Sequence, residues 1–72
     1  RRLFDRALEH LTVALELAPT NIEVLKALGK VEIKRGDSIA AANHYRRIVH
    51  LAPDGPDAHK ARESLDSMGM KP

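Results

Sequence analysis

The sequence predicts an all-α fold of antiparallel helical hairpins, and three observations carry that prediction. Apolar residues recur at intervals of three and four along most of the chain, which is the pattern of amphipathic helices rather than strands. The tripeptide Leu-Ala-Pro stands at residues 17–19 and again, 34 residues later, at residues 51–53. Glycine and proline fall between the periodic segments, where helices end or begin. A fixed period of this size indicates a helical repeat architecture.

The pattern predicts four helices, over residues 3–18, 21–35, 38–52 and 56–68. The first helix should end before Pro19, because proline lacks an amide proton and disfavours helical backbone in the residue before it. The second helix should begin at Thr20 or Asn21, since either side chain is a suitable N-cap. It should end at Gly36, which can adopt the left-handed conformation of a C-terminal cap.

The last two helices have similar signals. Asp37 or Ser38 is a suitable cap for the third helix, and Pro56 suits the first turn of the fourth. The fourth helix has only one narrow apolar stripe, so we expect it to pack against one neighbour and to expose its other side, as the end of a stack does. Gly69 should close this helix, and residues 70–72 should fray.

The composition excludes several classes of protein. A chain of 72 residues forms one small domain at most. It has no cysteine, so disulfides and thiolate metal sites are excluded. Its formal net charge of +2 is too small to imply nucleic-acid binding. No segment approaches the ~20 apolar residues of a membrane span. The sequence contains no set of side chains that predicts catalysis, so we expect no enzyme activity within these residues.

The chain matches itself when it is shifted by 34 residues. Ala7 then aligns with Ala41, His10 with His44, and Lys26 with Lys60, in addition to the repeated Leu-Ala-Pro. This self-similarity resembles the tetratricopeptide repeat, a 34-residue helix-turn-helix unit. The positions that match the family pattern are Leu25, Leu28, Gly29, Gly36, Ala41, Tyr45 and Pro53.

The physical chemistry of these residues agrees with the family pattern. Gly29 and Ala41 lack bulk, so the second and third helices can approach closely there, while Leu25 and Tyr45 fill the adjacent space. Leu25, Leu28, Ala41 and Tyr45 should therefore lie in the core. The chain departs from the family at Glu32, where an aromatic residue is common.

The resemblance implies a right-handed α-solenoid and a division of the single domain, residues 1–72, into three parts. Residues 1–21 resemble the second helix of a partial repeat, residues 22–55 a complete repeat, and residues 56–70 a C-terminal capping helix. The resemblance also implies a non-catalytic scaffold for protein–protein interaction, without a cofactor. In this family the first helix of each repeat lines a concave face, where extended peptides often bind.

The predicted concave face carries a row of polar residues. The candidate partner-binding residues are Glu23, Lys26, Lys30, Ile33, Lys60 and Ser64. One hypothesis is a basic groove that receives an acidic segment or a C-terminal carboxylate. The alternative is a solvated helix face, on which lysines are common. The carboxylate clamp of some family members is not expected, because Lys30 stands where that clamp needs an asparagine.

Two other hypotheses concern different surfaces. The first helix has no helix before it in this sequence, so Phe4, Leu8 and Leu15 should be partly uncovered and could mediate self-association. The outer face of the third helix carries Arg46 and Arg47, together with His50, which could contact nucleic-acid phosphates. Nucleic-acid binding is the less favoured hypothesis, because no aromatic residue stands among these cations to stack on bases.

No metal site is predicted. His10 and His44 hold equivalent positions, but neither has a second ligand at the spacing of a zinc motif. The sequence does not specify a compartment, and the cytoplasm is the default expectation.

Overall fold

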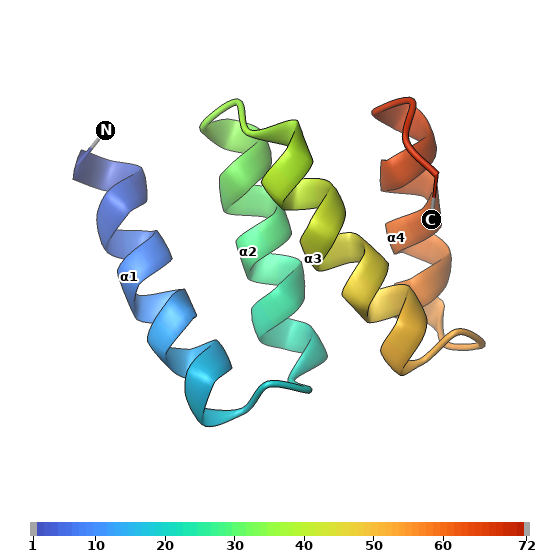
Figure 1. Cartoon of the computed structure of the whole chain (residues 1–72), viewed down its shortest axis with the longest axis horizontal. Helices are drawn as coiled ribbons and strands as arrows, with labels where there is room; N and C mark the ends of the chain where they lie inside the picture. The colour runs from blue at the N-terminus through green and yellow to red at the C-terminus, as the bar shows by residue number, and fades with distance from the viewer. Residues whose placement is uncertain (1, 72) are drawn as a thin grey trace.

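The computed structural model describes residues 2–71. They form four α-helices, α1 (Arg2–Leu17), α2 (Ile22–Lys34), α3 (Ser38–Leu51) and α4 (Pro56–Ser67), and no strand occurs among them. The helices stand in one row and alternate in direction, which places the two ends of the chain at opposite ends of the row (Figure 1). The all-α prediction is confirmed, and each predicted helix end lies within one residue of the observed one. Residues 1 and 72 of the predicted domain lie outside the described part.

In the turn between α2 and α3, hydrogen bonds cap both the end of α2 and the start of α3. Gly36 has a φ of 84°, its amide donates to the Ile33 carbonyl, and the Asp37 amide donates to the Glu32 carbonyl. These two bonds form a Schellman motif, which satisfies carbonyl groups left open at the end of a helix. Asp37 then caps α3, because its Oδ1 accepts from the Ala40 amide at 3.0 Å.

Two details of the helix ends differ from, or refine, the sequence predictions. Asn21, rather than Thr20, caps α2, with its Oδ1 accepting from the Val24 amide at 3.3 Å. The predicted fraying is wrong for Met70. Gly69 adopts a φ of 71°, so the Met70 amide donates to the Leu65 carbonyl at 2.9 Å and Met70 packs against the core. The predicted fraying of Pro72 concerns a residue outside the described part.

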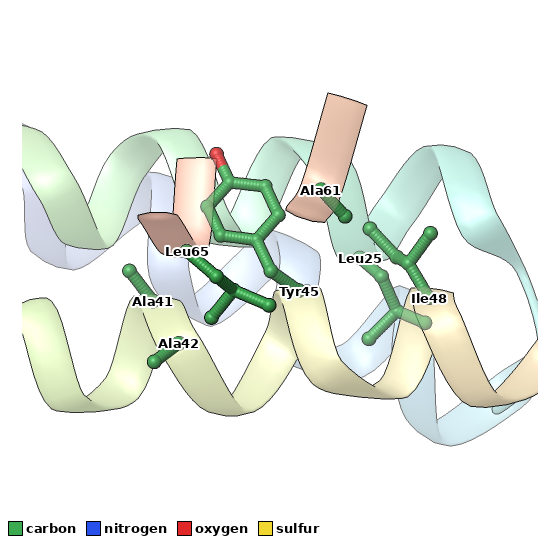
Figure 2. Close-up of a cluster of buried hydrophobic side chains, with 7 residues drawn as sticks. All are labelled: Leu25, Ala41, Ala42, Tyr45, Ile48, Ala61 and Leu65. Carbon is green, nitrogen blue, oxygen red and sulfur yellow. The ribbon is translucent and has the colours of Figure 1, made fainter. Parts of the chain in front are cut away.

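The core lies between α2, α3 and α4. It forms one cluster made of Leu25, Ala41, Ala42, Tyr45, Ile48, Ala61 and Leu65 (Figure 2). Leu28 and Ala58 are also buried. All four residues that the sequence analysis placed at the centre of the core are buried as predicted. Apolar burial of this kind is the main favourable term in folding, at roughly 25 cal/mol per Å².

The closest approach of α2 and α3 is at Gly29. A Cβ atom added at this position would lie 2.7 Å from Cζ of Tyr45, which is closer than real Cβ atoms come to a ring carbon. The ring of Tyr45 therefore occupies the space that any other residue at position 29 would need. Figure 2 shows this ring projecting away from α3, with Ala61 and Leu65 of α4 beside it.

Helix α1 is less deeply buried than the other helices. It packs mainly against α2, and Leu15 is its contribution to the core. None of its described side chains, residues 4–17, is fully buried. Phe4, Leu8 and Leu15 are half-buried, whereas Val13 and Leu17 are exposed, Leu17 to 82%.

Glu32, the departure from the family pattern, has a local explanation. Its carboxylate is buried, and Arg35 Nη1 lies 2.9 Å from its Oε1. Arg35 also lies 3.6 Å from Asp37 Oδ2. A buried carboxylate is tolerated only when it is paired, so Arg35 is the residue that permits Glu32 in this position.

Candidate functional site

A pocket of about 210 Å³ opens between α2 and α4, with α3 as its floor. Its lining residues are Lys26 and Lys30 of α2, Tyr45 and Ile48 of α3, and Asp57, Lys60, Ala61 and Ser64 of α4. We call this pocket the α2–α4 groove. It forms because α3 lies between α2 and α4 and keeps them apart. The lining residues of α3 are buried, whereas the lysines that line the groove from α2 and α4 are not.

Four of the six candidate partner-binding residues line the α2–α4 groove. Lys26, Lys30, Lys60 and Ser64 come together there from two helices. The other two candidates, Glu23 and Ile33, do not line it, although both are exposed on α2. The role of all six in binding a partner remains a prediction.

The lysines of the groove differ in their pairing. Lys26 Nζ lies 3.0 Å from Asp57 Oδ1 and 3.3 Å from Glu23 Oε2. Both hydrogen bonds raise the pKa of Lys26, and the bond with Asp57 has the larger effect. Lys30 and Lys60 are exposed and form no ion pair with the described residues. The uncompensated positive charge of the groove therefore lies on Lys30 and Lys60.

The floor of the groove is apolar with a polar edge. Ile48 is fully buried as a residue, and Tyr45 is 6% exposed. Burial raises the pKa of Tyr45, and the Ser64 hydroxyl opposes this effect. Since an ordinary tyrosine has a pKa near 10, the phenol is neutral at physiological pH and can donate or accept a hydrogen bond at the groove.

The sequence analysis missed part of this site. It assigned Tyr45 to the core only, and its candidate partner-binding residues did not include Ile48 or Asp57. A signal for Asp57 was present, because it stands 34 residues after Glu23 and so repeats an acidic position on the next concave helix. No comparable signal identifies Tyr45 and Ile48. A core residue of α3 lines a groove only where the helices on either side of it, α2 and α4, are far enough apart.

The arginines on the outer face of α3 form hydrogen bonds with other parts of the chain. Arg46 Nε donates to the Lys71 carbonyl at 2.9 Å, and Arg47 Nη2 donates to the Pro19 carbonyl at 3.1 Å. Both guanidinium groups therefore tie α3 to chain segments outside it. This arrangement leaves them less available to phosphate groups than the sequence alone suggested.

The histidines do not assemble into a site. His10 is exposed, while His44 is half-buried, and burial lowers its pKa. In the part of the chain that the structure describes, no three histidine, aspartate or glutamate side chains gather as metal ligands. No helix of the described residues has the length and apolar character needed to cross a membrane.

The comparison with protein families agrees with the geometry. A tetratricopeptide repeat model matches residues 2–65, which is most of the chain. The chain belongs to the tetratricopeptide repeat family. Tetratricopeptide repeats generally mediate protein–protein interaction and are typically scaffolds rather than enzymes. A search of curated proteins and a search of solved structures gave no significant match.

Proposed function

We propose that this tetratricopeptide repeat chain binds an extended, acidic protein segment in the α2–α4 groove. The observation that carries the proposal is the position of two unpaired lysines beside an apolar floor. Lys30 and Lys60 come from different helices and line the same pocket, whose floor is formed by Tyr45, Ile48 and Ala61. A segment with an acidic side chain next to an apolar one matches both features.

The two features contribute in different ways. The lysines attract an acidic segment and orient it, which raises the association rate and the specificity more than the affinity. The apolar floor contributes affinity, because a side chain that covers it leaves water. An exposed lysine face without an apolar floor would bind acidic polymers without selectivity, whereas this groove requires both kinds of side chain.

Charge reversal at the two unpaired lysines tests the proposal. The probe is a fluorescein-labelled, end-capped dodecapeptide of alternating glutamate and leucine, and binding is measured by fluorescence anisotropy. Lys30→Glu with Lys60→Glu should weaken binding by about tenfold or more at low ionic strength, because two attractive contacts become repulsive. Lys26 is left intact, because a glutamate there would face Asp57 and Glu23.

A matched control separates groove chemistry from net charge. Lys34→Glu with Lys71→Glu changes the net charge equally, and neither residue lines the groove. This control should bind the dodecapeptide almost as the unmodified chain does, and both double variants should keep a helical circular dichroism spectrum. Equal loss of binding in the two double variants would contradict the proposal.

A second candidate function is self-association through α1. It is favoured by the exposure of Val13, at 54%, and of Leu17, at 82%, on a helix that packs mainly against one neighbour. Light scattering of the isolated chain at millimolar concentration tests it. A dimer that Val13→Ser with Leu17→Ser converts to a monomer would support this function, and a monomer at all concentrations would remove it.

A further inference from the structure

We propose that Asp57 is a specificity-determining residue that competes with the acidic ligand inside the α2–α4 groove. This inference rests on the proposed function. In the free chain Asp57 forms an ion pair with Lys26. The groove is therefore positive at one end, and its charge is neutralised at the other. An acidic side chain is then accepted beside Lys30 and Lys60 and is rejected beside Asp57.

The geometry of the ion pair is the first argument. Lys26 Nζ and Asp57 Oδ1 are 3.0 Å apart, and both residues line the groove. Each of these side chains is only 30% exposed, so water screens the pair less than it screens a fully exposed one. A ligand carboxylate that approached Lys26 would have to take the place of a carboxylate that the chain already supplies.

The second argument is the order of charges along the groove. Lys30 follows Lys26 by one turn of α2, and Lys60 follows Asp57 by one turn of α4. Because α2 and α4 run in the same direction (Figure 1), the two unpaired lysines lie one turn beyond the ion pair. Glu23 lies 3.3 Å from Lys26, so two carboxylates surround the paired lysine. No carboxylate in the described part of the chain is paired with Lys30 or Lys60.

This arrangement selects a ligand by where its charge lies. A segment with its acidic group at the Lys30 and Lys60 end meets only attraction. A segment with a second acidic group one turn away meets Asp57 and Glu23, and like charges in contact disfavour binding. Asp57 therefore limits the groove to segments whose acidic charge is confined to one end.

Replacement of Asp57 by a neutral residue tests the inference. Asp57→Asn should bind the alternating glutamate and leucine dodecapeptide about three- to fivefold more tightly, because it removes one repulsive charge and leaves Lys26 with Glu23 as its remaining partner. Asp66→Asn is the matched control, since it makes the same change on an exposed site of α4 outside the groove. Its affinity should be unchanged. Asp57→Ser should bind as tightly as Asp57→Asn does. This second variant shows whether the gain comes from loss of the carboxylate or from the asparagine side chain that replaces it.

A double-mutant cycle separates competition from a merely structural tether. Lys26→Met should change the affinity little in the unmodified chain, where Asp57 occupies the ammonium group. In the Asp57→Asn background Lys26→Met should reduce the gain in affinity, because Lys26 supplies part of that gain. Tyr45 provides an independent readout. It is the only tyrosine in a chain without tryptophan, and it lines the groove, so its fluorescence should report the same affinities.

The outcomes distinguish this inference from the proposed function. If both Asp57 variants bind no more tightly than Asp66→Asn while charge reversal at Lys30 and Lys60 still weakens binding, the competition is overturned and the proposed function stands. If the dodecapeptide binds neither the unmodified chain nor Asp57→Asn, both are overturned. Tighter binding by both Asp57 variants, reduced on adding Lys26→Met, supports the inference.

Discussion

Helices α1 and α3 hold equivalent places in the 34-residue period, yet the structure buries them to different depths. Ala41 and Tyr45 of α3 are 0% and 6% exposed, whereas their equivalents in α1, Ala7 and Leu11, are half-buried. Helix α3 packs against α2 on one side and α4 on the other, while α1 packs mainly against α2. The repeat pattern therefore specifies which face of a helix is apolar, and the number of neighbouring helices determines how far that face is buried.

This difference matters for the proposed function, because the α2–α4 groove belongs entirely to the well-packed side. Its floor is α3, which packs against both α2 and α4, and its walls are these two helices. Rigid supporting elements hold binding residues more accurately than partly packed ones do. The comparison between α1 and α3 can be tested with three sets of variants, taken here from the largest expected effect to the smallest.

The largest effect should come from truncating a buried side chain of α3. Ile48→Ala should lower the free energy of unfolding by about 2–5 kcal/mol, because it leaves a cavity at a fully buried site. Leu11→Ala, in the half-buried face of α1, should lower it by only about 1 kcal/mol. Urea denaturation followed by circular dichroism measures both values. Equal losses would show that α1 is packed as tightly as α3.

The contact between α2 and α3 gives a sharper test at Gly29. Gly29→Ala should lower the free energy of unfolding by about 1–3 kcal/mol, because the new methyl group overlaps the ring of Tyr45 and overpacking is destabilising. Tyr45→Leu should relieve the overlap, so the two substitutions should be strongly non-additive in the same urea experiment. Additive effects would contradict the close approach of the two helices.

The smallest expected effect concerns His44. Burial lowers the pKa of His44, an effect that Arg47 strengthens and Glu32 opposes. The folded chain therefore binds a proton at His44 less readily than the unfolded chain does. The contribution to stability is complete above the unfolded pKa of about 6.5 and is lost as the pH falls below that value.

His44→Gln should flatten the decline in stability below pH 6.5, because it removes the group that burial makes harder to protonate in the folded chain. Urea midpoints at pH 7.5 and pH 5 measure this decline, and an NMR titration of the histidine C–H signals measures the pKa of His44 directly. A midpoint for His44 at or above 6.5 would contradict the assigned effect of burial.

Much of the fold could be predicted from the sequence, because its determinants are local. Pro19, Gly36 and Asp37 act on backbone atoms within a few residues of themselves, so their effects follow from elementary stereochemistry. The core residues Leu25 and Tyr45 follow from helical periodicity. Even the error at Met70 is local in origin, because a glycine cap returns the chain toward the helix that it closes.

The site was only partly predictable, because it depends on how far one helix is displaced along its neighbour. Lys26 and Asp57 are separated by a whole hairpin, and their contact depends on the offset between α2 and α4. The bond from Arg47 to the Pro19 carbonyl depends on a similar offset. Periodicity places a residue on a face of its own helix, but it does not determine which residue of another helix it meets.

The central claim is that the α2–α4 groove, and neither the exposed face of α1 nor the arginines of α3, receives the partner. Chemical-shift perturbation of the ¹⁵N-labelled chain by the alternating glutamate and leucine dodecapeptide tests this claim most directly. We predict that the largest changes fall on the amides of Lys30, Tyr45 and Lys60. Changes concentrated at Val13 and Leu17, or around Arg46 and Arg47, would contradict the claim.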